Sequence, residues 1–400
     1  MRQFWAKMDR SIWSSHLLLL VISVFFVNFG QGLFQGASTN YFVDTLHLSD
    51  TQVLWLQGIR EVPGLLLIAI AAATMHWPLV RRAALSILLM GVGYGLYAVI
   101  NSYIALVAMA LTASLGFHAW VPLQASLGMG LAAREHSGRV MGILAASRSL
   151  AIIVGMGGLA IVSRLFADIS LRFYYVLGGG LIVLAAYLLT RLPKDLGAAN
   201  GSQPRMLVKR RYWLYYVLTL FEGVRTQVFS AFGTLVLVKE FDLQVWQISL
   251  VLLASGVVNL LAAPIMGKLL DHWGERRVLS IGYVLLALGF AGYATLRNPW
   301  LLSGALVFIN MLLLCSMGLS TYVNRIAPRE ELTPTLSAGV SFNHITSVAM
   351  SFVAGSLMGI AGYQAVAWGA VGIILLSVPF ALAIRTDTEA VRQASPATAR

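Results

Sequence analysis

Long apolar runs, each of about twenty residues or more, recur along the whole chain and are separated by short polar segments. One such run spans a membrane as an α-helix, because a helix rises about 1.5 Å per residue and the hydrocarbon layer is about 30 Å thick. The strands of a transmembrane β-barrel instead alternate in hydropathy over about ten residues. The runs therefore predict an all-α polytopic membrane protein and exclude a barrel.

The apolar runs predict twelve membrane-spanning helices, a number that fits a chain of 400 residues. Only 11% of the residues are charged, compared with roughly a quarter in a typical soluble domain. So few charges could not cover a soluble protein of this length, which excludes a soluble enzyme and an extended nucleic-acid binder. The predicted helices cover residues 16–43, 52–75, 83–100, 103–132, 139–163, 171–190, 213–238, 246–267, 278–296, 300–324, 334–360 and 364–385.

The basic residues between these helices are distributed unequally over the two sides of the membrane. Twenty-one of them fall on the side of the N-terminus and four on the other side, when the helices alternate in direction. Lys and Arg concentrate in cytoplasmic loops, so both termini are expected in the cytoplasm, and we expect a multi-pass protein of the cell membrane, of the bacterial inner-membrane kind.

The longest polar stretch divides the chain into nearly equal parts. Its Gly, Asn, Ser and Pro residues are typical of a linker, and its basic residues are expected to lie against anionic lipid headgroups rather than against nucleic acid. We therefore expect two pseudo-symmetric six-helix bundles, with an N-terminal bundle at 1–190, a basic cytoplasmic linker at 191–212, a C-terminal bundle at 213–385 and a disordered cytoplasmic tail at 386–400.

The two halves resemble each other when they are aligned at an offset close to 195 residues. Parallel repeats of this kind are typical of transporters whose two bundles rock around a site at their interface. The matched positions include Phe34 with Phe229, Arg81–Arg82 with Arg276–Arg277, Tyr97–Ala98 with Tyr293–Ala294 and Arg134–Glu135 with Arg329–Glu330.

The loop after the eighth predicted helix carries a family motif. Its sequence, Gly267-Lys-Leu-Leu-Asp271-His-Trp-Gly274-Glu-Arg276-Arg277, resembles the loop signature G-x-x-x-D-x-x-G-x-R-R of the major facilitator superfamily. Gly267 would allow close helix contact, Asp271 would cap or pair near a helix end, Gly274 would make the turn, and the two arginines would bind at the cytoplasmic boundary.

The first-half copy of this loop keeps Arg81 and Arg82, but has Ala72 for the glycine and His76 for the acid. The resemblance implies a secondary transporter of the bacterial twelve-helix type, a symporter or an antiporter, in which these loops act during the conformational change. It also implies a protein that binds a small-molecule substrate, uses no cofactor or metal and works as a monomer in membrane lipid.

Five ionisable residues lie inside predicted helices, about nine to twelve residues from a helix end and hence near the centre of the bilayer. They are Arg60, Glu61, Arg148, Glu222 and Arg225. An ionisable group costs several kcal/mol in hydrocarbon unless it is paired or hydrated, so such residues mark functional positions by default. Three arginines against two acids favour an anionic or zwitterionic solute, because guanidinium binds carboxylate or phosphate through two hydrogen bonds.

These charges allow several roles. Arg148 and Arg225 would bind the anionic group, and protonation of Glu61 or Glu222 would couple transport to protons. Arg60 and Glu61 fit a fixed midplane salt bridge as well as they fit a substrate role, and Glu222 and Arg225, three residues apart, could pair along their helix.

Uncharged polar residues supply the other candidates for substrate binding. Asn28, Gln31 and Gln35 form a stripe along one face of the first helix. Polar side chains in membrane helices also hold helices together, which is the alternative for each of them. The remaining candidates are His118, Asn310, Asn343 and His344.

The sequence predicts transport of a small organic solute, anionic or zwitterionic, by alternating access with proton coupling. A proton-driven pump for drug-like amphipathic compounds is the alternative within the class, favoured by the aromatic residues Phe29, Phe34, Trp120, Phe229 and Phe232. A non-transporting scaffold or receptor is the alternative from another class. An enzyme is not expected, because the chain has no HExxH, GxSxG or Walker-type motif, and the lack of a Walker-type motif also disfavours ATP-driven transport.

Overall fold

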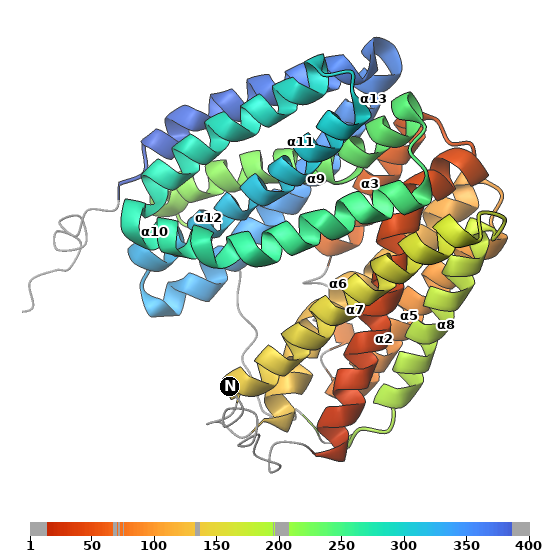
Figure 1. Cartoon of the computed structure of the whole chain (residues 1–400). Helices are drawn as coiled ribbons and strands as arrows, with labels where there is room; N and C mark the ends of the chain where they lie inside the picture. The colour runs from red at the N-terminus through yellow and green to blue at the C-terminus, as the bar shows by residue number, and fades with distance from the viewer. Residues whose placement is uncertain are drawn as a thin grey trace, which may run out of the picture. The chain divides into compact units, whose positions relative to one another are not determined.

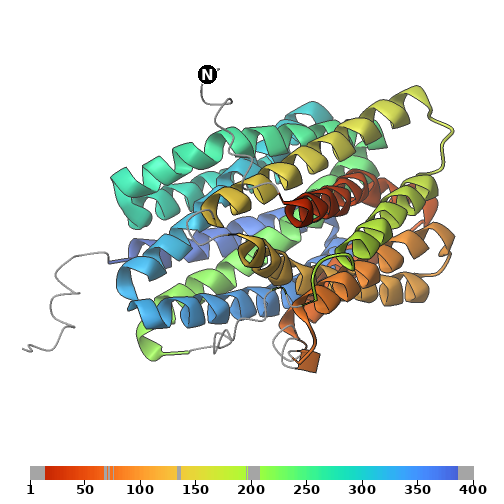
Figure 2. The same cartoon turned by 90° about the horizontal axis from the view of Figure 1, so that it is seen from below.

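The structure is a computed structural model that describes residues 14–66, 70, 73–74, 76–132, 137–194, 196 and 208–385. The described residues form helices and short connections and include no strand, as Figure 1 and Figure 2 show. A helix satisfies its backbone hydrogen bonds within one segment, as the hydrocarbon layer requires. The all-α class is therefore confirmed. The predicted tail at 386–400, most of the predicted linker and the Arg134–Glu135 match lie outside the described residues.

The described residues of the first half form six long helices. Three of them begin at a serine whose hydroxyl accepts a hydrogen bond from the first turn: Ser14 from Leu17, Ser102 from Ala105 and Ser170 from Arg172. The helices are α2 (Ser15–Asn40), which continues as the π-helix η2 (Tyr41–Thr45), α3 (Asp50–Leu65), α5 (Leu79–Gly95), which continues as the 3-10 helix η3 (Leu96–Val99), α6 (Tyr103–Leu131), α7 (Ser137–Leu165) and α8 (Leu171–Leu189).

The described residues of the second half form helices of very different lengths, two of which have 51 and 54 residues. Asn298 caps the helix that follows it and Pro299 occupies that helix's first turn, where a missing N–H costs nothing. The elements are η5 (Arg210–Tyr212), α9 (Trp213–Phe241), α10 (Val245–Thr295), α11 (Pro299–Leu312), η6 (Leu313–Ser316), α12 (Met317–Ile326) and α13 (Arg329–Leu382).

Single glycines break both long elements. Gly274 in α10 has φ 76° and Gly362 in α13 has φ 77°, a left-handed region that glycine adopts without a steric cost. Each glycine divides its element into two helices, at the places where the sequence predicts two separate helices. The predicted connection between 267 and 278 is shorter in the structure, because the helix continues up to the turn at Gly274 and resumes after it.

Eight helices of the described chain are long and apolar enough to cross a membrane. Two of the eight, α10 and α13, are the ones divided by a glycine. In addition, α3 and α9 occupy the ranges where the sequence predicts two further crossings. The full count of twelve crossings stays a prediction.

The chain divides into two compact units. The first unit comprises Met1–Leu48, Val62–Gly201 and Gln244–Leu250, and the second comprises Ser49–Glu61, Ser202–Leu243 and Val251–Arg400. Most of α3 thus belongs to the second unit, where Trp55 Nε1 donates a hydrogen bond to the carbonyl of Phe352 at 3.1 Å. The boundaries predicted at 190 and 213 stay a prediction.

Within the first unit, α2 packs against α7 and α8, and α5 packs against α6 and α8. The backbones of α2 and α7 approach closely, since a Cβ atom added at Gly155 would lie 2.6 Å from the carbonyl oxygen of Phe29. By contrast, a Cβ added at Gly157 would meet no atom within 4 Å. Close backbone approach at small residues is the usual way in which helices associate in lipid.

The internal repeat is visible in the packing of aromatic rings. In the first unit the ring centroids of Phe34 and Tyr94 lie 4.6 Å apart. In the second unit the residues at offsets of 195 and 196, Phe229 and Phe290, have centroids 5.0 Å apart. The same helix-to-helix contact therefore occurs in each unit.

Candidate functional site

A pocket of about 440 Å³, lined by both polar and apolar residues, opens within the second unit. Three elements form its wall: α9, the segment from η6 to α12, and α13. Two of the sequence candidates, Glu222 and Asn343, meet in this pocket. Its polar lining consists of Tyr215, Thr219, Glu222, Ser316, Ser320 and Asn343.

Close packing of α9 on α13 brings Glu222 and Asn343 to the same pocket. Gly223 has the backbone of Asn343 directly against it, so that an added Cβ would collide with the Asn343 carbonyl. The hydroxyl of Ser347 lies 3.2 Å from the carbonyl of Gly223 and 3.3 Å from Oδ1 of Asn343, and donates to these oxygens. The amide of Asn343 is thus held by its own helix while its side chain lines the pocket.

Arg225 is engaged inside the second unit. It is 3% exposed, its guanidinium carbon lies 3.8 Å from the centre of the Tyr283 ring, and Nη1 donates to Ser377 Oγ at 3.2 Å. Stacking on an aromatic face stabilises a buried guanidinium. Glu222 and Arg225 form no ion pair in this part of the described chain, so the intrahelical pair allowed by their spacing is not present.

Glu61 and His344 form a pair between α3 and α13. Oε2 of Glu61 lies 2.9 Å from Nδ1 of His344, and each side chain is 17% exposed. Both residues belong to the second unit, although they are 283 positions apart in the sequence. Beside them, Nη1 of Arg60 donates to Oε1 of Gln57 at 3.2 Å.

The predicted polar stripe on α2 divides into two environments. Asn28 is buried and donates to the carbonyl of Val24 at 2.8 Å. Gln31 is also buried, with Nε2 3.2 Å from the sulfur of Met90. Gln35 is exposed. The first two therefore hydrogen-bond within the helix packing, which leaves Gln35 as the accessible member of the stripe.

The other candidates do not line the pocket. His118 on α6 is half-buried, and Asn310 on α11 is half-buried as well. Arg148 on α7 is exposed and forms no ion pair or hydrogen bond with another residue of the described chain. Its guanidinium is thus available to an anion.

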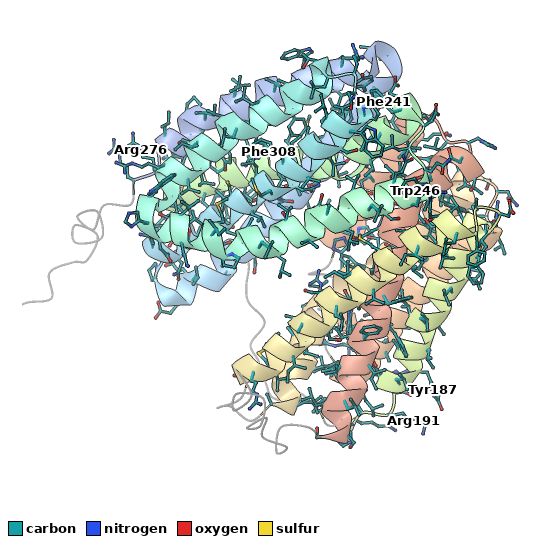
Figure 3. All side chains as sticks on the ribbon, in the orientation of Figure 1. Tyr187, Arg191, Phe241, Trp246, Arg276 and Phe308 are labelled. Carbon is teal, nitrogen blue, oxygen red and sulfur yellow. The ribbon has the colours of Figure 1, made fainter. Side chains whose placement is uncertain are left out.

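The signature loop is built around Gly274. Asp271, Arg276 and Arg277 are exposed there, and Figure 3 shows Arg276 at the end of its bundle. A Cβ added at Gly267 would meet no atom within 4 Å, so the close helix contact expected at Gly267 is not seen. In the first-half copy, Arg81 is exposed with its guanidinium carbon 5.0 Å from the Trp77 ring centre, and Arg82 is half-buried.

Several residues of these sites were not singled out from the sequence. Glu275, which is fully buried, pairs with Nε of Arg325 at 2.7 Å, although its position is unspecified in the loop signature. Tyr283 and Ser377, which hold Arg225, lie on predicted helices that carry no midplane charge. The signal that could have found them in the sequence is a hydroxyl-bearing side chain at the same predicted depth in the membrane as Arg225. The described residues include no cluster of three or more His, Cys, Asp or Glu that could hold a metal.

The sequence matches the model of the Major Facilitator Superfamily over residues 20–320 and 215–400. The match covers most of the chain, whose fold is the helical one described above. The protein belongs to the Major Facilitator Superfamily, and it is a membrane transporter rather than an enzyme. No curated protein matches the sequence significantly.

Solved transporters share this fold. The nucleoside transporter NupG aligns with a TM-score of 0.76 at 16% identity, over 93% of this chain and 99% of its own. A D-xylose–proton symporter aligns with a TM-score of 0.72 at 14% identity, over 92% and 97%. A bacterial homologue of the human lysosomal transporter Spinster, inward-facing and occupied, aligns with a TM-score of 0.70 at 14% identity, over 92% and 94%. Identities this low show a common fold and leave the substrate of this chain open.

Proposed function

We propose that the protein is a proton-coupled secondary transporter that moves a small zwitterionic organic solute by alternating access. The observation that carries the coupling is the 2.9 Å contact between Glu61 and His344. An imidazole side chain generally gains or loses a proton near neutral pH. Its attraction to a neighbouring carboxylate depends on whether it carries that proton, and a low dielectric constant strengthens the attraction.

The positions of the two residues in the chain make this contact a suitable coupling element. Glu61 lies on a helix of the first sequence half and His344 on a helix of the second. Protonation of the carboxylate removes the charge attraction, whereas protonation of the imidazole beside an ionised carboxylate strengthens it. Protonation of the imidazole therefore favours a state in which the two helices are joined, and protonation of the carboxylate favours a state in which they are separated. A proton-dependent balance between two states is what coupling requires.

The polar groups that line the pocket favour a solute that carries hydrogen-bond donors and a positive charge. Glu222 supplies a carboxylate there, and Ser316, Ser320 and Asn343 supply neutral polar groups. Arg225, already stacked on Tyr283, is not available in this arrangement to balance an anion in the pocket. Glu222 would therefore bind an amino group or hydroxyl groups of the solute.

Arg148 keeps the proposed role of binding the anionic group, since its side chain is exposed and unpaired among the described residues. Glu222 favours a positive group on the solute, and Arg148 favours a negative one. This favours a zwitterion over a simple anion.

The alternative of a pump for amphipathic compounds has less support. Phe34, Trp120, Phe229 and Phe232 are each at most 4% exposed, and their rings fill the interiors of the two units. Most of the aromatic side chains that favoured this alternative thus serve packing in this structure.

Transport by purified protein in liposomes tests the proposal. A thermal-shift screen of amino acids, dipeptides, nucleosides, sugars and organic cations selects the solute, and uptake is then measured with and without an inward proton gradient. We expect the gradient to raise uptake of a zwitterion in the wild type, and Glu222→Gln or Arg148→Gln to weaken solute binding by about tenfold, the effect of about 1.4 kcal/mol. Glu240→Gln and Arg385→Gln, at exposed positions outside the pocket, are the matched controls.

The proposal would be overturned in parts. Stabilisation by cations alone would reject the zwitterion, and uptake independent of the gradient at every pH would reject the coupling. A protein that binds solutes but shows neither uptake nor exchange would be the scaffold or receptor.

A further inference from the structure

A second and larger pocket lies on the first unit, in the groove between α5 and α8. It has a volume of about 750 Å³ and contains none of the candidate transport residues except Arg81. Figure 1 and Figure 2 show these two helices side by side. The predicted helices that correspond to them carry no midplane charge, and none of the residues proposed to bind the solute or the proton lines this groove.

One end of the groove is cationic. Arg81 and Lys194, both exposed, line it, and the described residues of its wall include no acid. Arg191 lies just beyond, with its guanidinium carbon 5.0 Å from the ring centre of Tyr187, itself a lining residue. Figure 3 shows Tyr187 and Arg191 together at this end of α8.

Aromatic rings hold two of these cations in place. Arg81 lies over Trp77 and Arg191 over Tyr187, each at 5.0 Å, and Arg191 also donates a hydrogen bond to the Tyr187 hydroxyl. A guanidinium ordered in this way loses less rotamer freedom when it binds a phosphate, and its planar N–H groups match phosphate oxygens. The cationic end is therefore suited to a phosphodiester.

The rest of the groove is apolar. Leu85 and Leu88 on α5 are 37% and 39% exposed, and Val183 on α8 forms the facing wall. These side chains lie one to two helical turns from Arg81, in the direction of the predicted membrane interior. A ligand that fits the whole groove has an anionic head at the basic end and hydrocarbon chains along the leucines.

We propose that this groove is a binding site for one anionic phospholipid. Basic pockets between membrane helices at the cytoplasmic boundary bind such headgroups, and this groove lies on the side that the distribution of Lys and Arg predicts to be cytoplasmic. A water-soluble phosphate compound would use the cations but leave the apolar wall unfilled. A phospholipid uses both.

Lipid retention by the purified full-length protein tests the site. Native mass spectrometry in detergent compares phosphatidylglycerol with phosphatidylcholine of identical acyl chains. We expect the wild type to retain phosphatidylglycerol about tenfold more strongly, the size of a difference of about 1.4 kcal/mol. The double variant Arg81→Gln with Lys194→Gln should reduce this preference to that of the control lipid.

Arg276→Gln with Arg277→Gln is the matched control, because the internal repeat places these exposed arginines at the positions of Arg81 and Arg82. It removes the same charge without touching the groove and should leave the preference unchanged. Leu88→Trp, which fills the apolar part, should lower retention of both lipids. Melting temperatures establish that each variant is folded.

Three results would overturn the proposal. Equal retention of the two lipids by the wild type would reject selectivity for an anionic head. An unchanged preference in the Arg81 and Lys194 variant, or an equal loss in the control variant, would place the binding elsewhere. Displacement of phosphatidylglycerol by glycerol phosphate alone would show a site for a free anion.

Discussion

The carboxylate of Glu61 on α3 contacts the imidazole of His344 on α13 at 2.9 Å, and both side chains are largely buried. The first residue belongs to the half of the chain that precedes the linker, and the second to the half that follows it. A contact of this kind joins two distant parts of the sequence through two ionisable side chains. Its consequences for transport can be measured directly.

Replacement of His344 by Ala should separate two activities that are linked in the wild type. Without the imidazole, Glu61 loses the ionisable group that contacts it at 2.9 Å, so accumulation driven by a proton gradient should fall by about tenfold or more, in keeping with a change of at least about 1.4 kcal/mol. Exchange of solute across liposomes without a gradient should continue. Equal losses of accumulation and exchange would point to misfolding or to a binding role.

Gly223 should tolerate no side chain. A methyl group there meets the backbone of Asn343, so Gly223→Ala should lower the free energy of unfolding by roughly 1–3 kcal/mol, the usual cost of overpacking. Gly157→Ala is the control, because its methyl group would meet open space and the substitution should be neutral or slightly stabilising. Thermal unfolding in detergent measures both, and similar melting temperatures for the two variants would contradict the packing.

Arg225 should be replaceable by Lys only at a cost in stability. Lysine lacks the flat guanidinium that lies 3.8 Å from the Tyr283 ring centre, so Arg225→Lys should destabilise the protein by about 1–2 kcal/mol. Tyr283→Phe keeps the ring and should have a smaller effect than Tyr283→Ala. If Arg225→Lys instead leaves the melting temperature unchanged and abolishes solute binding, Arg225 binds the solute in another conformation.

Glu331 at the start of α13 anchors the segment before α9. Its carboxylate contacts Lys209 at 2.9 Å, accepts a hydrogen bond from the Tyr212 hydroxyl at 3.0 Å and pairs with Arg211. Glu331→Gln should therefore speed hydrogen exchange of the amides at 209–212. Glu330→Gln, an exposed neighbour without an ion pair in the described chain, should not. Equal exchange in both variants would contradict the anchor.

The anchor should not depend on Tyr212 ionisation at physiological pH. Burial, and then the hydrogen bond to Glu331, raise the pKa of Tyr212 to about 12 from an ordinary value of 10.0. The phenol therefore stays a neutral donor, and its contribution to stability is present below pH 10 and is lost as the pH rises through about 12. An exchange rate at 209–212 that stays constant between pH 7 and pH 9, after correction for intrinsic exchange, would agree. If the exchange rate of the wild type rose between pH 7 and pH 9 to a value above that of Glu331→Gln, a neutral Tyr212 in this range would be contradicted.

Much of the fold follows from local features of the sequence. Apolar runs predict helices because a helix satisfies its own backbone hydrogen bonds in lipid. Gly274 marks a turn because glycine adopts a positive φ without the steric cost that a side chain would bring. The repeat of Phe34 at Phe229 likewise predicts an equivalent position in each unit, and the aromatic contacts show it. Such features act over a few residues or recur at a fixed spacing, so they can be read along the chain.

The sequence by itself thus determined the all-helical class, the superfamily and the short set of ionisable residues inside helices. Only the tertiary structure decided what these residues do: Arg225 stacks on Tyr283, Glu61 meets His344, and the buried Glu275 pairs with Arg325. Hydropathy acts on each segment separately and fixes its depth in the membrane. Partners depend on which helix faces pack together, and that is set by the summed contacts of whole helices rather than by the spacing of a few residues.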